Sequence, residues 1–263
     1  MAGGRGLNQG PALEVRNLTV AFPQSKTTVI ALEEVDLIVD AGDLLVVIGP
    51  SGGGKSTLLN AIAGLVAPSR GTIKAHNKAV TAPGQDRGMV FQRDTVFPWM
   101  RVSENIRYGL KARGVRGAEA EQIVAHYIED VGLAGCERSW PKELSGGMRK
   151  RVAVAAAFAS DPETLLMDEP FGSLDFVTKM RLQQLLLRLW GETGKTIVFV
   201  THDVDEALTL ADRIVVISAG HVIDDLPINF RRPRTDELRA DPEAIAIRRH
   251  LLQRLGLVEG GTE

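Results

Sequence analysis

The stretch DLLVVIGPSGGGKSTLLNAIAGL, residues 43–65, decides the fold class. An apolar run passes through a glycine-rich loop into a helical pattern, so a strand, a loop and a helix follow one another directly. Gly49, Gly54, Lys55 and Ser56 match G-x-x-x-x-G-K-[ST] in this context, in which backbone amides surround phosphate groups at a helix N-terminus. We expect Lys55 to reach the terminal phosphates of a nucleotide and the Ser56 hydroxyl to ligate magnesium. The candidate nucleotide-binding residues here are Gly49, Ser51, Gly52, Gly54, Lys55, Ser56 and Thr57.

Three further apolar runs, residues 164–169, 196–202 and 213–218, each lie near a helical pattern. This is typical of strands that are buried on both faces of a parallel sheet. Residues 12–22 and 28–40 instead alternate partly between apolar and polar side chains, which predicts an antiparallel sheet open to water on one face. The sequence therefore predicts an α/β fold with a mostly parallel sheet and an antiparallel edge sheet.

A helical segment interrupts this core and predicts an inserted helical subdomain. Residues 102–113 and 118–131 have helical periodicity, and the leucine stripe of residues 179–190 indicates a helix packed on the core. The shared apolar face of the second helix comprises Ile123, Val124, Tyr127, Ile128 and Val131. The predicted divisions are a flexible tail at 1–12, a core formed by 13–92 and 162–226, a helical subdomain at 93–161 and a C-terminal extension at 227–263.

The composition excludes several classes of protein. The 31 basic and 33 acidic residues leave a net charge of -2, so the chain has no general attraction for nucleic acid or anionic lipid. The single cysteine, Cys136, excludes an intramolecular disulfide and fits a reducing compartment. No run approaches the roughly 20 apolar residues of a membrane span, and the N-terminal residues lack the apolar segment of a secretory signal. We expect a cytoplasmic protein unless a partner holds it at a membrane.

Polar residues end the predicted parallel strands. Asp168 and Glu169 are neighbours on one strand, so their side chains are expected to point in opposite directions and to serve different roles. We interpret Asp168 as a magnesium partner and Glu169 as the base that orients an attacking water. His202 ends the next strand, and Gln92 is placed to sense magnesium or water. Each residue alone would be an ordinary strand-end residue, but ligands of open α/β sheets bind at this edge, where Gly49 also lies.

A second candidate anion site lies in LSGGMRKR, residues 144–151. Ser145, Gly146 and Gly147 stand where a helix begins, which suits an anion, but the stretch has no aspartate or histidine for chemistry. The sequence alone does not say why one chain carries two phosphate-binding segments.

In their order along residues 13–225, these motifs resemble the ATP-binding subunits of ABC transporters, which have a P-loop NTPase core. GPSGGGKST resembles the Walker A motif, MVFQ the Q-loop, LSGGM the signature, LLMDE the Walker B motif with its catalytic glutamate, SLD at 173–175 the D-loop, and His202 the switch histidine. Three positions depart from the common pattern: Met148 stands where many members have glutamine, Gly53 replaces a frequent cysteine and Ala156 a common arginine.

The resemblance implies a use for the second anion site. Two subunits of this family close head to tail, so Ser145 and the amides of Gly146 and Gly147 of one chain would contact the γ-phosphate held by Lys55 of the other. The resemblance also implies ATP and Mg²⁺ as cofactors, a nucleotide contact by Asp175 of the D-loop, and magnesium contacts by Ser56, Gln92 and Asp168. Phe22 falls where the family places an aromatic residue on adenine, although a phenylalanine that ends a strand can equally be a core residue.

The chain most resembles the nitrate, sulfonate and taurine importer group. The resemblance is carried by residues 84–110, by the stretch DEPFGSLD...LLLRLWGETGKTIVFVTHDVDEAL within residues 168–208, and by the ending LPINFRRPR. It implies an ATP-hydrolysing subunit at the cytoplasmic face of the plasma (inner) membrane. Its partners would be a second copy of the chain, transmembrane permease subunits and an extracytoplasmic solute-binding protein. Phe97, Pro98 and Trp99 would line the groove for a cytoplasmic permease helix, or would simply pack the helical subdomain.

Two alternatives belong to other classes. Soluble ABC-type ATPases that act on nucleic acid or ribosomes usually join two ATP-binding halves or insert long coiled coils, whereas this chain has one phosphate loop and no heptad run. The chain also has no basic stripe, so we expect no nucleic-acid partner. A small-molecule kinase would need an acceptor site in place of the signature.

Overall fold

The computed structural model describes residues 10–24, 27–93, 96–234 and 236–258. The chain divides into two compact units, residues 1–83 with 196–263 and residues 84–195, and each is described by itself. Residues 1–9 of the predicted flexible tail, which runs to residue 12, lie outside the described residues. The finer division drawn from the sequence stays a prediction.

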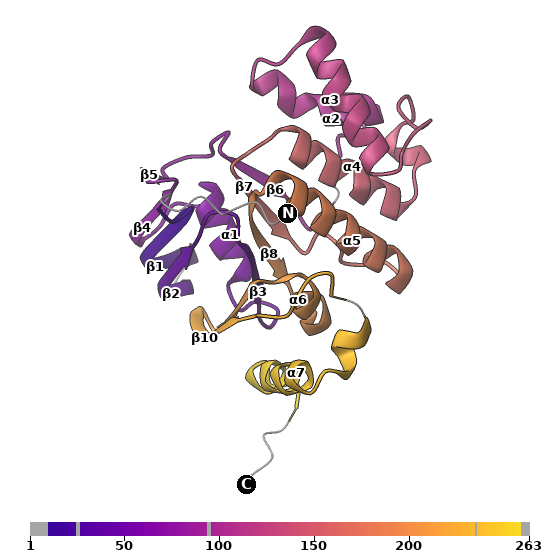
Figure 1. The fold of residues 1–263 in the computed structure, drawn as a ribbon. Helices are drawn as coiled ribbons and strands as arrows, with labels where there is room; N and C mark the ends of the chain where they lie inside the picture. Colours follow the sequence, from indigo (N-terminus) through magenta and orange to yellow (C-terminus); the bar gives the residue numbers. More distant parts are fainter. Residues whose placement is uncertain (1–9, 25–26, 94–95, 235, 259–263) are drawn as a thin grey trace. The chain divides into compact units, whose positions relative to one another are not determined.

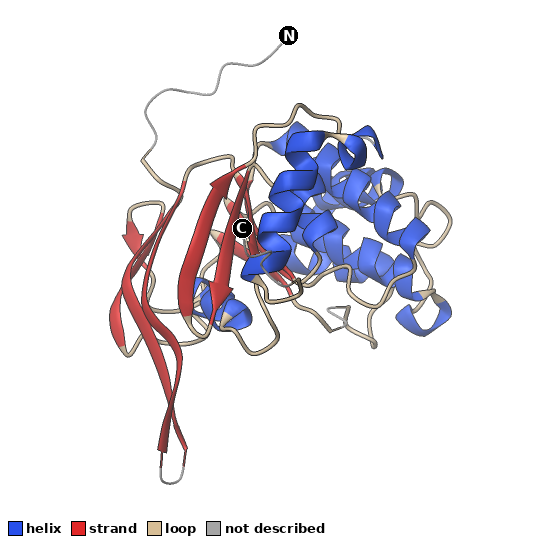
Figure 2. Ribbon diagram, turned by 90° about the horizontal axis from the view of Figure 1, so that it is seen from below, coloured by secondary structure: helices blue, strands red, loops and turns tan. Residues whose placement is uncertain are grey.

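An antiparallel sheet in the first unit has the strand order β2-β1-β4-β5. Its strands β1 and β2 pair antiparallel along most of their length, visible in Figure 2 as the long two-stranded red ribbon. Burial alternates along the second half of β2, where Leu32, Val35, Leu37 and Val39 are buried. This alternation confirms that the sheet has one face open to water. The strands are β1 (Leu13–Gln24), β2 (Thr27–Val39), β4 (Arg70–Ala75) and β5 (Lys78–Ala79).

The other sheet strands of the first unit follow the order β10-β9-β3-β8, with β3 parallel to both of its neighbours. Every residue of β3 and β8 is buried, as the continuous apolar runs predict. The edge strand β10 pairs antiparallel with β9 and was not predicted as a strand, because its sequence HVIDDLP lacks such a run. The strands are β3 (Leu44–Ile48), β8 (Thr196–Thr201), β9 (Arg213–Ser218) and β10 (His221–Pro227).

Two helices of the first unit follow strands of its parallel sheet, and a third belongs to the C-terminal extension. The extension begins with a short 3₁₀ turn, η2, and continues into α7, where the Asp241 carboxylate caps the helix by accepting from the amides of Glu243 and Ala244. The helices are α1 (Lys55–Ala63), α6 (Val204–Leu210) and α7 (Pro242–Arg254), and η2 spans Asp236–Ala240.

The second unit contains two parallel strands and the predicted helical region. Helices α2, α3 and α4 pack together (Figure 1), and α3 buries Ala120, Val124 and Ile128 on the predicted face. Helix α5 begins earlier than its leucine stripe indicated, because the Asp175 carboxylate caps it by accepting from the amide of Thr178. The elements are β6 (Arg87–Val90), β7 (Thr164–Asp168), α2 (Val102–Ala112), α3 (Gly117–Asp130), η1 (Pro141–Glu143), α4 (Gly146–Ala159) and α5 (Phe176–Thr193).

Among the helices of the described ranges, none has both the length and the apolar character that crossing a membrane requires.

Candidate functional site

The phosphate loop, residues 49–54, connects β3 to α1 and is held partly by its own backbone. The Lys55 ammonium donates hydrogen bonds to the carbonyl oxygens of Gly49 at 2.8 Å and Pro50 at 2.9 Å. The amide of Gly53 closes a turn onto the carbonyl of Pro50 at 3.1 Å. Lys55 is only 6% exposed, so its charge is directed into the loop.

Two positions of this loop require glycine. A Cβ atom at Gly49 would lie 2.0 Å from the carbonyl oxygen of Ile217 on β9. Gly54 has a φ of 107°, and a Cβ atom there would lie 2.6 Å from the carbonyl oxygen of Ala31 on β2. Only glycine tolerates such approaches. The loop is therefore seated against both sheets of the first unit.

The first turn of α1 fits a triphosphate and a magnesium ion. Its N-cap is Gly54, and within this described helix no side chain caps the N-terminus and no acidic residue occupies the first turn. The amides there carry partial positive charge that favours an anion. Ser56 is exposed in this turn, where its hydroxyl is the kind of hard oxygen ligand that magnesium prefers.

His202 lies at the same sheet edge as the start of the phosphate loop. Strands β3 and β8 are parallel neighbours, and Ile48 pairs with Thr201. Gly49 and His202 are the next residues along the two strands, which confirms that they share the carboxyl edge where ligands of such sheets bind. The catalytic role of His202 stays a prediction.

In the second unit, Asp168 and Glu169 follow each other at the end of β7. Asp168 is the last strand residue and is 8% exposed. Glu169 has a φ of 42°, in the left-handed region that residues other than glycine seldom adopt. Glu169 lies just beyond the strand, and the opposite directions expected for the two side chains stay a prediction. Unusual backbone conformations of this kind gather at functional sites.

Gln92 connects Glu169 to α4, the helix that begins within the signature. The side-chain amide of Gln92 donates to Oε2 of Glu169 at 2.9 Å. The backbone carbonyl of Gln92 accepts from the ammonium of Lys150 on α4 at 2.7 Å, and Lys150 is 8% exposed. Sequence reasoning missed Lys150, and the only signal was its position within LSGGMRKR.

The signature and the D-loop segment meet at the first turns of two helices. Ser145 caps α4 by accepting from the amide of Met148 at 3.2 Å, and Asp175 caps α5. A Cβ atom at Gly147 would lie 2.6 Å from the methyl group of Thr178, so the two helix starts are in contact. Hydrogen bonds from the side chain and amide of Thr178 hold the pKa of Asp175 below its usual value. Ser145, Gly146 and Asp175 are exposed and therefore open to a ligand or a partner.

Two expectations from the sequence concern Phe22 and the grouping of Gly49, Glu169 and His202. Phe22 lies on β1 opposite Val29 and is 41% exposed, so it is not a core residue, and its stacking on adenine stays a prediction. Gly49 and His202 belong to the first unit and Glu169 to the second, so the expected grouping of all three stays a prediction.

The chain belongs to the ABC transporter family, whose sequence description matches residues 32–172. The fold is that of a P-loop NTPase, and the chain is an ATPase that uses ATP with Mg²⁺. ATP with Mg²⁺ fits three features of the first unit: the glycine-lined loop, the buried Lys55 and the start of α1, which no side chain caps.

Similar proteins include the taurine import ATP-binding protein TauB of Escherichia coli (strain K12), which is 43% identical over 232 residues, covering 86% of this chain and 91% of TauB. TauB of Shigella dysenteriae serotype 1 (strain Sd197) matches with the same identity and coverage. Among solved structures, the dimeric ATP-binding cassette MJ0796 bound to ADP and Pi has a TM-score of 0.75 and 31% identity over 83% of this chain and 100% of that one.

Proposed function

We propose that this chain hydrolyses ATP to energise an importer of small sulfonates, with taurine as the first candidate solute. The observation that carries the proposal is the 43% identity to taurine import ATP-binding proteins over 86% of this chain. A groove in the second unit supports it, because the groove offers a membrane subunit a place to bind.

The groove, about 510 Å³ in volume, is lined by exposed aromatic rings and by small residues of α4. Trp99 is 67% exposed, and the ring of Phe97 lies 5.6 Å from that of Trp99 and 4.7 Å from that of Tyr108. Ala153 and Ala157 leave space opposite these rings. Exposed aromatic clusters of this kind mark protein interaction sites, and the groove accepts a short apolar helix of a permease.

A buried asparagine holds the aromatic loop in place before any partner binds. Asn105 accepts from the amide of Phe97 at 2.7 Å and donates to the carbonyls of Met100 and Arg101 at 3.0 Å each. Asn105 is 4% exposed. A loop ordered in this way loses little conformational entropy when a partner binds it.

The groove communicates with the catalytic carboxylate through one residue. Phe91 lines the groove, and the next residue, Gln92, holds Glu169. A partner that moves Phe91 therefore moves the amide bound to Glu169. This connection supports control of ATP hydrolysis by an occupied permease.

We assign the chemical steps residue by residue. The backbone amides of the phosphate loop and the ammonium of Lys55 hold the β- and γ-phosphates of ATP. Ser56, Gln92 and Asp168 would hold Mg²⁺, which would offset the negative charge of the phosphate oxygens. Glu169 accepts a proton from the water whose oxygen attacks the γ-phosphorus, and the bond to the ADP oxygen breaks. His202 contacts the same phosphate.

We assign the signature to a second copy of the chain. Ser145, Gly146 and Gly147 of one copy bind the γ-phosphate held by the other, so ATP stabilises a closed head-to-tail dimer and hydrolysis releases it. The other partners are permease subunits and an extracytoplasmic solute-binding protein. These partners place the chain at the cytoplasmic face of the inner membrane and choose the solute.

Uptake of labelled taurine tests the proposal in cells of the native organism from which the gene has been deleted. The wild-type gene should restore uptake, the Glu169→Gln gene should not, and unlabelled sulfonates should compete where nitrate does not. Competition by nitrate alone would contradict the sulfonate class. Undiminished uptake of both solutes in the deletion strain would contradict a role in importing them.

A further inference from the structure

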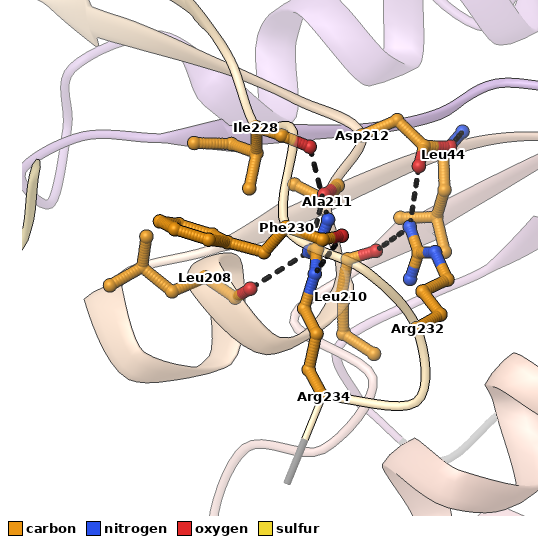
Figure 3. Close-up of polar contacts among 9 residues, drawn as sticks. All are labelled: Leu44, Leu208, Leu210, Ala211, Asp212, Ile228, Phe230, Arg232 and Arg234. Carbon is orange, nitrogen blue, oxygen red and sulfur yellow. Dashed lines mark hydrogen bonds and ion pairs between the residues drawn. The ribbon is translucent and has the colours of Figure 1, made fainter. Parts of the chain in front are cut away.

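Two arginines of the C-terminal extension bind the end of helix α6 (Figure 3). Nη1 of Arg234 donates to the carbonyl oxygens of Leu208 at 2.8 Å and Ala211 at 2.6 Å. Nη2 of Arg232 donates to the carbonyl of Leu210 at 2.6 Å. The last carbonyls of a helix lack partners within the helix, and cations are favourable there. The arginines therefore complete the C-terminus of α6.

The same arginines connect α6 to two other segments of the first unit. Arg234 also donates to the carbonyls of Ile228 at 3.1 Å and Phe230 at 3.3 Å, within its own segment. Arg232 pairs with the Asp212 carboxylate at 2.8 Å, and that carboxylate accepts from the amide of Leu44 at 3.2 Å. Leu44 begins β3, the strand that leads to the phosphate loop.

The other end of α6 is continuous with His202. The Thr201 hydroxyl donates to the carboxylate of Glu206 at 2.5 Å and accepts from the amide of Asp203 at 3.1 Å. Asp203 caps α6 by accepting from the amides of Asp205 and Glu206. His202 lies between these bonded residues, so it follows any movement of the short helix.

We propose that Arg232 and Arg234 are positioning residues that fix α6 and thereby hold His202 in place for ATP hydrolysis. The inference rests on the proposed catalytic role of His202. It gives the basic segment of the C-terminal extension a function in the ATPase cycle, because α6 has seven residues and loss of its C-terminal anchor tilts the whole helix.

The chemistry of these contacts requires arginine. The planar guanidinium of Arg234 presents donors in several fixed directions to four carbonyl oxygens, which the compact ammonium of lysine does not reproduce. Burial and the charge of nearby Arg232 lower the pKa of Arg234 to about 10, so the side chain stays charged at neutral pH. Helix α7 adds a contact at the opposite end of α6, where Arg248 pairs with Asp205 at 2.9 Å.

The test compares steady-state ATP hydrolysis by the purified full-length chain and its variants Arg234→Met, Arg232→Met, Arg234→Lys and His202→Ala. Arg231→Ala is the matched control, because Arg231 is an exposed arginine of the same segment. We expect each methionine variant to lower kcat about tenfold with KM for ATP unchanged, since small misplacements of catalytic groups have effects of this size or larger. Arg234→Lys should recover part of the loss, and Arg231→Ala should match the wild type.

A second readout observes His202 directly. In histidine ring NMR spectra, the His202 resonance is identified by its absence from the His202→Ala spectrum. This resonance should shift in both methionine variants, whereas the resonance of His126 in the other unit should not. A lower melting temperature with kcat and the His202 resonance unchanged would show that the arginines only stabilise the fold and would overturn the inference. Full turnover in His202→Ala would instead refute the catalytic role of His202 and the inference with it.

Discussion

The side-chain amide of Gln92 holds the carboxylate of Glu169 at 2.9 Å. Gln92 is itself fixed by Lys150 of the signature helix and directly follows Phe91 of the aromatic groove. The residue proposed as catalytic base is thus bound to the residue through which we propose that a partner acts. Gln92 thus contacts residues of two motifs that are distant in the sequence, Glu169 after β7 and Lys150 on α4.

Replacing Gln92 by alanine should uncouple hydrolysis from the partner. We expect Gln92→Ala to lose most of the stimulation of ATPase activity by the solute-loaded importer, measured relative to the variant's own basal rate. Gln85→Ala is the matched control, because Gln85 bonds the carbonyl of Ala112 elsewhere in the same unit. Stimulation of Gln92→Ala equal to that of the wild type would contradict this connection.

ATP should join two copies of the chain when hydrolysis is prevented. Glu169→Gln removes the base, so light scattering of this variant with MgATP should show a shift from monomer to dimer. Adding Ser145→Arg should abolish the dimer, because the larger cationic side chain blocks the γ-phosphate position, whereas adding Thr81→Arg at an exposed site should not. A dimer that persists with Ser145→Arg would rule out the composite site.

Shortening Trp99 should affect transport and not the isolated enzyme. We expect Trp99→Ala to reduce co-purification with the permease and solute uptake, because it removes the most exposed ring of the groove, while ATPase activity of the free subunit stays within about twofold of the wild type. Leu65→Ala, an exposed apolar residue of the other unit, serves as the control. Equal uptake by the Trp99 and Leu65 variants would argue against the groove as the docking site.

The phosphate loop should not tolerate a methyl group at Gly49. Gly49→Ala brings Cβ to 2.0 Å from the carbonyl of Ile217, so the loop must shift. We expect the free energy of unfolding to fall by about 1–3 kcal/mol and ATP affinity to be lost. Gly191→Ala in α5 has open space around the new atom and should raise the free energy of unfolding by about 0.5–1 kcal/mol. Denaturant unfolding of both variants measures the two changes in the free energy of unfolding, and nucleotide titration measures their affinity for ATP.

The attachment of α7 should weaken in acid. Burial would raise the pKa of Asp224, but hydrogen bonds from His250, the amide of Asp225 and Arg254 outweigh it and hold the pKa below the usual 3.8. A carboxyl group whose pKa is lowered by folding stabilises the fold above its unfolded pKa, and that stabilisation is lost as the pH falls through the folded pKa. Hydrogen exchange of α7 should therefore be faster in Asp224→Asn than in wild type at pH 7, and this difference should shrink at a second pH below 3.8. Glu129→Gln on α3 should show no such difference at either pH.

The sequence predicted the elements whose signals are local. The apolar runs at 44–48 and 196–201 are buried on both faces, and such strands can be recognised from a few adjacent residues. The glycine and lysine pattern identified the phosphate loop because the motif itself specifies the backbone that binds phosphate.

Contacts between distant segments could not be predicted in this way. Arg234 binds carbonyls 23 and 26 residues away, and Lys150 binds a carbonyl 58 residues away. Helix α6 has only seven residues, too few for a periodic pattern to show. The hydrogen bond between Gln92 and Glu169 joins residues 77 apart in the sequence, and no local pattern indicated the positive φ at Glu169.

The most direct test of the account is the identity of the proteins that bind this chain in its native membranes. A tagged subunit, purified from gently solubilised membranes and examined by mass spectrometry, should bring a polytopic permease in comparable amount, and Trp99→Ala should bring less of it. Recovery of the wild-type chain only from the soluble fraction, together with ribosomal or nucleic-acid partners, would contradict a role in import and leave the ATPase site intact.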